Sequence, residues 1–210
     1  MTNYDKCMKY LQEEKGLNLS QSLLVIEGLK SAVDVDMMTS QDYDYGQMRE
    51  ILHGLQSGVD VSLYSDSRFS VSQMEYLRQC LENKLSIVEF ASPEYSLAQM
   101  KAIMICCGLK LDAAPFKRDE LMAVYANAIL KYYPAIDLDG DFSWLSLCED
   151  EEKVLYVLEA KVNGSFRNDM LMKSTRELRT ERESEKRNAF YDDLLNPDRL
   201  KRFELFSSYE

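Results

Sequence analysis

A glutamine recurs at a constant spacing of 26 residues through the first half of the chain, at Gln21, Gln47, Gln73 and Gln99. Three residues before each glutamine stands a residue that favours the N-cap of a helix: Asn18, Asp44, Ser70 and Ser96. An N-cap side chain and a glutamine three residues later form a capping box, in which each side chain accepts a hydrogen bond from the other residue's backbone N–H. The spacing therefore predicts four helices that begin at the same place of a repeated unit.

Apolar residues also recur within this unit. Counted from the N-cap, they occupy places four, seven, eleven and fifteen, which share one face of an α-helix. Place seven holds Val25, Ile51, Leu77 and Ile103, and place eleven holds Leu29, Leu55, Leu81 and Cys107. We predict that both places are buried. Place ten holds Gly28, Gly54, Cys80 and Cys106. We interpret these cysteines as small core residues, because this place requires a small side chain.

A second capping residue follows each predicted helix and precedes a short helical segment: Asp34, Asp60, Ser86 and Asp112. A unit of this kind cannot bury its apolar face alone, so successive units must stack. The sequence predicts an all-α fold in which residues 1–117 form a solenoid-like helical-repeat array, with an N-terminal cap helix around Tyr4–Glu14. Residues 118–164 are predicted to form C-terminal capping helices, and residues 165–210 a charged helical tail.

Within the capping segment, "RDELMAVYANAILKYY" is predicted to be one helix whose inward residues are Leu121, Val124, Ile129 and Leu130. A second helix is predicted over "EDEEKVLYVLEAKV", with Gly164 as its stop. The tail contains "RTERESEKRN", which has no apolar residue. A helix that is polar on all sides extends into solvent or lies on a partner. We therefore expect residues 175–188 to form a projecting helix.

The second unit, "YGQMREILHGLQSGVDVSLYSDSRFS", resembles the tandem repeats "QMxEIxxGLxxGVDVSxYAxPxF" of proteins on mobile elements of gut Firmicutes. The third and fourth units keep "SxxQM" and lose "GVDVS", and the first lacks the methionine. The resemblance covers residues 18–117. It implies a helical-repeat architecture and a mobile-element setting. It transfers no catalytic residue, because that family has no settled activity.

Composition makes several functional classes poor fits. Five cysteines without CxxC spacing, behind an N-terminus unlike a signal peptide, are typical of a reduced cytoplasmic protein. A single histidine, His53, disfavours zinc sites and Ser–His or Cys–His nucleophiles. No apolar run approaches the roughly 18 residues of a membrane span. The sequence predicts a protein that is not an enzyme and that holds no cofactor or metal.

Charge indicates the kind of partner. The chain carries a net charge of −11, and residues 1–164 hold 26 acidic and 15 basic side chains. Such a body repels phosphate backbones and attracts a basic protein surface, so direct nucleic-acid binding is disfavoured. Helical periodicity does not explain two acidic clusters, which we predict to bind the partner: Asp137, Asp139 and Asp141, and Glu149, Asp150, Glu151 and Glu152. The first resembles a calcium loop, but its glycine is at position four instead of six, so we interpret it as a turn.

These observations favour a non-catalytic protein-binding protein. In a mobile-element setting its most concrete form is an acidic inhibitor of a host defence nuclease, similar to anti-CRISPR proteins, with a Cas nuclease as partner. Four basic residues of the tail are further partner-binding candidates: Arg179, Arg182, Lys186 and Arg187. The same helix is also a candidate for contacts in a homodimer. The alternatives are an enzyme with an unrecognised carboxylate site and a nucleic-acid-binding regulator that acts through the C-terminal helix.

Overall fold

Helices begin at all four predicted N-caps. The computed structural model describes residues 2–40 and 42–194, and this part of the chain is all-α, without a β-strand. The four repeat helices are α2 (Leu19–Lys30), α3 (Tyr45–Ser57), α4 (Val71–Glu82) and α5 (Leu97–Leu109). At each one the cap side chain accepts from the glutamine N–H, and the glutamine side chain accepts from the cap N–H. The capping boxes are therefore confirmed.

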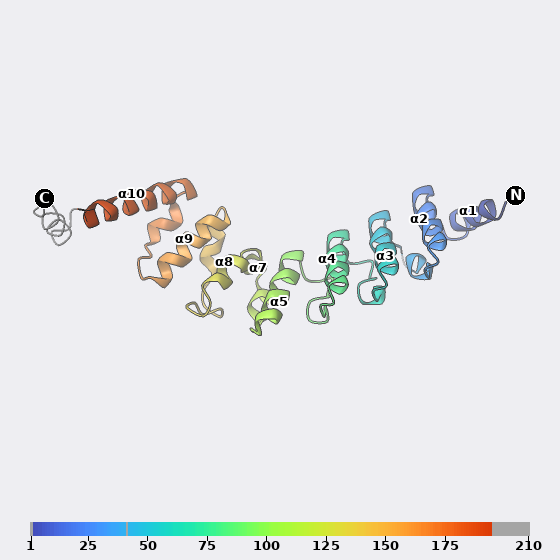
Figure 1. Ribbon diagram of the computed structural model, residues 1–210, viewed down its shortest axis with the longest axis horizontal. Helices are drawn as coiled ribbons and strands as arrows, with labels where there is room; N and C mark the ends of the chain where they lie inside the picture. The colour runs from blue at the N-terminus through green and yellow to red at the C-terminus, as the bar shows by residue number, and fades with distance from the viewer. Residues whose placement is uncertain (1, 41, 195–210) are drawn as a thin grey trace, which may run out of the picture. The chain divides into compact units, whose positions relative to one another are not determined.

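The chain divides into two compact units, Met1–Val124 and Tyr125–Glu210. Figure 1 shows the repeat helices of the first unit, α2 to α5, following one another in chain order. The first unit opens with α1 (Asn3–Glu13), which has its own capping box between Thr2 and Asp5 and which contacts α2. Along the first unit, α2 contacts α3, α3 contacts α4, and α4 contacts α5. Each repeat helix thus packs against the repeat helices next to it in the sequence.

The second capping residue starts a short helix in three of the four repeats. Asp34 and Asp60 precede the 3-10 helices η1 (Asp36–Thr39) and η2 (Val61–Leu63), and Asp112 precedes α6 (Ala114–Arg118). Each aspartate accepts from the backbone N–H two residues later, at distances of 2.9–3.1 Å. In the third repeat, residues 88–90 form a turn instead of a helix.

The buried face of the repeat helices is centred on places four, seven and ten. Met48, Met74 and Met100 at place four are fully buried, as is Ile51 at place seven. The prediction for place eleven is wrong. Its residues range from half-buried to exposed, and Leu29 keeps 50% of its surface.

Small residues at place ten explain this rotation of the helix face. A Cβ at Gly54 would overlap the Tyr64 hydroxyl, and a Cβ at Gly28 would stand 2.7 Å from Val35 Cγ1. In the first two repeats the segment after the helix therefore packs on place ten, which explains the small residue there. Place eleven is left at the edge of the contact.

All four repeat helices end in the same left-handed conformation. Gly58 has φ 72°, and the matching residues Ala32, Lys84 and Lys110 have φ between 55° and 60°. The next N–H bonds back to the carbonyl of place ten, for example Leu85 to Cys80 at 2.9 Å. This is the Schellman arrangement. Three residues other than glycine adopt this backbone conformation. We infer that packing of the segment that follows each helix imposes it.

Side-chain amides tie the start of each repeat to its end. The Nε2 of Gln21, Gln47 and Gln73 donates, at 2.6–2.9 Å, to the carbonyl of the aromatic residue that stands directly before the next N-cap: Tyr43, Phe69 and Tyr95. Gln99 donates to the carbonyl of Lys117 at 2.9 Å. Asp119 then caps α7 (Glu120–Val124) and accepts from Leu121 N at 2.9 Å. A shortened fifth repetition of the pattern thus closes the first unit.

The single helix predicted over "RDELMAVYANAILKYY" is wrong. The chain leaves helical geometry at Tyr125, between α7 and α8 (Ala126–Lys131). Val124, predicted to face inward, is 55% exposed, whereas Met122 and Ala123 are buried. The two helices belong to different compact units, so each buries its own apolar residues and no continuous stripe exists.

A lysine organises the second unit. This unit continues with η3 (Ser143–Leu147), α9 (Glu151–Val162), η4 (Asn168–Met172) and α10 (Thr175–Leu194). Lys153 of α9 is 4% exposed, and its Nζ donates to the Leu147 carbonyl at 2.8 Å and the Leu171 carbonyl at 3.0 Å. The ammonium group therefore joins both 3-10 helices to α9. The expected helix with its stop at Gly164, which has φ 76°, is confirmed.

Candidate binding surfaces of the C-terminal unit

The acidic cluster at Glu149–Glu152 lies at the start of α9 and holds α10. Glu149 Oε1 accepts from the backbone N of Thr175 at 2.6 Å and from its Oγ1 at 2.7 Å. Asp150 Oδ2 accepts from the same hydroxyl at 2.9 Å. These bonds to Thr175 lower the pKa of Glu149 below its ordinary value. Three carboxylates of this cluster, those of Glu149, Asp150 and Glu152, are therefore engaged within the unit.

Two of the four basic candidates in the tail are engaged in the same way. Arg179 bonds Glu152 through Nε at 3.1 Å and through a second, shorter contact, and this pairing lowers the pKa of Glu152. Arg182 Nη2 bonds Glu159 at 2.9 Å and lies 5.2 Å from the centre of the Tyr156 ring. Lys186 and Arg187 stand on an exposed stretch of α10, residues 183–190.

The projecting-helix prediction is therefore wrong for the first two turns of α10. Thr175 and Leu178 are 6% and 4% exposed, so this end of the helix is packed on α9. The polar stretch seen in the sequence begins one residue after Leu178, and ion pairs to α9 replace the missing apolar stripe. Residues 183–190 are exposed, as expected of a projecting segment.

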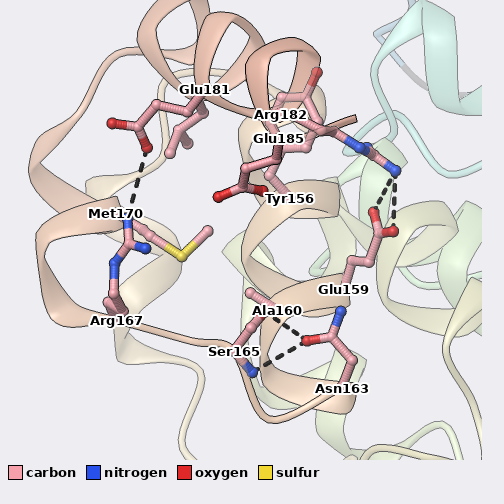
Figure 2. A pocket seen from close by; sticks show the side chains of 11 residues that line it. Tyr156, Glu159, Ala160, Asn163, Ser165, Arg167, Met170, Glu181, Arg182 and Glu185 are labelled. Atoms are coloured by element: carbon pink, nitrogen blue, oxygen red, sulfur yellow. Dashed lines mark hydrogen bonds and ion pairs between the residues drawn. The ribbon is translucent and has the colours of Figure 1, made fainter. Parts of the chain in front are cut away.

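A small pocket lies between α9, η4 and the packed part of α10 (Figure 2). Its volume is about 170 Å³. Met170 and Leu178 supply apolar lining, and the walls carry two ion pairs, Arg182 with Glu159 and Arg167 with Glu181. The first pair joins α10 to α9, and the second joins α10 to the residue before η4, so the pocket walls hold α10 in place.

The other predicted cluster borders a larger cleft. Asp137 and Asp141 stand on the loop before η3, and with Ile136, Phe142 and the C-terminal half of α9 they line a space of about 260 Å³. Asp137 Oδ1 accepts from Asp139 N at 3.0 Å, and Asp141 Oδ1 accepts from Ser143 N at 2.9 Å. The interpretation of "DLDGD" as a turn is confirmed by these bonds, which also fix the direction of both carboxylates.

Trp144 and Lys161 complete the cleft, and neither was predicted from the sequence. The indole Nε1 donates to the Asp141 carbonyl at 3.1 Å, which ties the ring to the acidic loop. Lys161 Nζ stands 5.3 Å from the Trp144 ring centre and 4.2 Å from the Phe166 ring centre. The chain's single tryptophan, next to an acidic turn, was the signal available in the sequence.

The first unit buries one carboxylate and two cysteine thiols among its described residues. Glu50 of α3 is the one buried carboxylate of the described residues, and it pairs with Arg78 of α4 at 3.0 Å. Burial raises the pKa of Cys106 to about 11, and Cys80 is also buried, consistent with the predicted core role. His53 is exposed on α3. The buried acid is therefore matched by a cation of the neighbouring helix.

Comparisons with protein-family models, with curated proteins and with solved structures find no match to this chain. Within the described residues, no helix combines the length and apolar character that crossing a membrane requires. The same residues contain no group of three or more His, Cys, Asp or Glu side chains placed to hold a metal ion.

Proposed function

We propose that this protein is a non-catalytic protein-binding module whose second unit presents an acidic surface to a basic partner. The observation that carries the proposal is the contrast between the two acidic clusters. Both clusters are mostly exposed, but Glu149, Asp150 and Glu152 bond residues of α10. Asp137 and Asp141, which line a cleft, accept instead from the backbone N–H two residues later. The binding surface is therefore assigned to the Asp137–Asp141 loop.

The first unit is proposed to be a solenoid-like helical-repeat array. Four capping boxes at one spacing and a glutamine amide that bonds the residue before the next N-cap support regular stacking. In such arrays each repeat contacts its neighbours, and the exposed places form an extended surface. The exposed places of the array would form such a surface within the first unit.

The charge balance supports a basic partner. Residues 125–164 hold eight acidic and three basic side chains, and residues 137–152 hold seven acids and no base. A surface of this sign speeds the association of a positively charged protein and disfavours nucleic acid. The concrete form of the proposal is an anti-CRISPR-like inhibitor that occupies a basic nucleic-acid channel on a Cas nuclease of the host.

The test is a target-binding and cleavage assay on a panel of purified Cas nucleases with the protein added. Inhibition should weaken as salt rises, because attraction between exposed charges is screened within about 8–10 Å at 0.1–0.15 M. The double variant Asp137→Asn/Asp141→Asn should lose it. The matched control is Glu27→Gln/Glu75→Gln on the repeat helices, which removes the same net charge. If no Cas nuclease of the panel is inhibited, the anti-CRISPR-like form of the proposal is wrong.

Loss of inhibition in the control as well would mean that net charge, and not this loop, determines binding. The Glu149–Glu152 cluster is unsuitable for this test. Changing those residues would break the bonds to Thr175 and Arg179, and would detach α10 at the same time.

A further inference from the structure

We propose that the cleft beside Trp144 receives an arginine side chain from a basic segment of the partner. The proposal rests on the proposed function and names the group that the acidic surface recognises. The cleft is bounded by the loop at residues 135–144 and by the C-terminal half of α9. All of its lining residues belong to the second unit.

The dimensions and lining of the cleft fit a side chain. Pockets for drug-sized molecules run from about 300 to 1,000 Å³, and this cleft has about 260 Å³. Its lining combines Ile136 and the buried Phe142 and Leu158 with the exposed carboxylates of Asp137 and Asp141. This arrangement matches a long side chain with an apolar stem and a charged end.

The two carboxylates are placed to hold a planar cation. Each uses Oδ1 for its turn bond, and no bond among the described residues engages the Oδ2 of Asp137 or Asp141. A guanidinium presents several N–H donors in one plane and bonds carboxylates in a fork geometry. Arginine can therefore contact the loop without breaking either turn.

The aromatic side of the cleft already attracts a cation of the protein itself. Lys161 Nζ lies over the rings of Trp144 and Phe166. A ring face holds a cation by its quadrupole, and arginine uses such faces more often than lysine does. Lys161 is also a positive charge within the site, so it opposes the entry of a second cation. Its removal must therefore strengthen the binding of a cationic guest and weaken the binding of an anionic one.

Trp144 makes the test direct, because it is the only tryptophan of the chain. The probe is the peptide acetyl-Gly-Gly-Arg-Gly-Gly-amide, titrated at low salt while tryptophan fluorescence is recorded. The control peptide carries citrulline, which keeps the shape of arginine and lacks its charge. We expect a saturable change with the arginine peptide and none with the citrulline peptide.

Charge variants of the cleft test whether it prefers a cationic side chain. One unit charge about 4 Å away in water changes affinity about fivefold, so Asp141→Asn should weaken and Lys161→Gln should tighten binding by about that factor. Glu27→Gln, on α2 of the first unit, should change neither. Weaker binding by Lys161→Gln, equal binding of the citrulline peptide, or no saturable signal would each overturn the proposal.

The outcome is separable from that of the proposed function. A partner whose binding needs Asp137 and Asp141 but leaves Trp144 fluorescence and the Lys161→Gln affinity unchanged would contradict the arginine site alone. A cleft that binds the arginine peptide, in a protein that inhibits no Cas nuclease, would contradict only the nuclease version.

Discussion

The side-chain amide of Gln47 donates a 2.7 Å hydrogen bond to the backbone carbonyl of Phe69, 22 residues later. The same side chain accepts a 2.9 Å bond from the backbone N of Asp44. One glutamine therefore both starts its own helix and fixes the place where the next repeat begins. The matching bonds of Gln21 and Gln73 show why the spacing of 26 residues is kept. An inserted residue would separate the amide from its acceptor.

Gln47→Glu should destabilise the first unit by about 1–3 kcal/mol, because it removes the amide that donates to the buried Phe69 carbonyl. Gln47 makes two such bonds, to Ser67 and Phe69, so the loss should exceed that for Gln21→Glu, which removes one. Urea denaturation gives the free energy of unfolding. The control Gln12→Glu makes the same change at an exposed place of α1 and should stay within about 0.5 kcal/mol. Equal effects at Gln47 and Gln12 would refute the linking role.

Leu77→Ala should cost about 2–5 kcal/mol, the range for a leucine that leaves a cavity in a core. Leu77 at place seven is fully buried. Leu29→Ala, at the half-exposed place eleven, should cost less than about 1 kcal/mol, since little apolar surface returns to water. A urea melt of each variant gives the comparison. A larger loss for Leu29→Ala than for Leu77→Ala would show that place eleven is buried, as the sequence predicted.

The helix C-termini allow a reciprocal test. Gly58→Ala should destabilise the chain by about 1 kcal/mol, because a Cβ disfavours the left-handed conformation. Lys84→Gly should stabilise it, since Lys84 holds the same conformation with φ 60°. Thermal melts of the two variants should shift in opposite directions. A destabilised Lys84→Gly variant would show that the lysine side chain contributes contacts that outweigh its backbone strain.

Local sequence predicted the repeat helices well. A capping box needs two residues three apart, and all its partners lie within one turn, so Asn18, Asp44, Ser70 and Ser96 could be identified directly. The choice between places ten and eleven could not, because it depends on residues such as Tyr64 that pack back onto Gly54. The break at Tyr125 was also hidden, since it coincides with the boundary between two compact units.

The candidate surface was predicted less completely. The acidic residues were recognised, but the two clusters looked equivalent. What separates them is the hydroxyl of Thr175 and the guanidinium of Arg179, which meet acids 25–27 residues earlier in the chain. No local pattern encodes contacts of that separation. The contact of Lys161 with the Trp144 ring likewise joins residues of different elements, and no local pattern predicts it.

Acid should release α10 from α9. Bonds from Thr175 hold the pKa of Glu149 below its usual value of about 4.3, and Arg179 does the same for Glu152. A carboxylate whose pKa is lowered in the folded state stabilises that state above its unfolded pKa. This stabilisation is lost as the pH falls through the lower, folded value. We therefore expect the methyl NMR signals of buried Leu178 to shift below about pH 4, toward an exposed environment.

Thr175→Val should weaken this dependence, because it removes the hydroxyl that bonds Glu149 and Asp150. Its Leu178 methyl signals should already be displaced toward the exposed position near pH 7. The control is Thr180→Val, whose hydroxyl bonds the Arg176 carbonyl within α10. Identical titrations of the two variants would show that the Thr175 hydroxyl does not hold the helix.

Lys153→Met should destabilise the second unit and leave the first unchanged. The variant keeps the apolar stem but leaves the Leu147 and Leu171 carbonyls without their charged donor. Hydrogen bonds to charged groups contribute about 1.5–3 kcal/mol, which sets the expected loss. Trp144 lies in the second unit, so its fluorescence during a urea melt reports on this unit alone, while circular dichroism follows both. The exposed Lys131→Met, on α8, should stay within about 0.5 kcal/mol. If Lys153→Met leaves the Trp144 transition in place, the two carbonyls find other donors, and the lysine does not hold the 3-10 helices to α9.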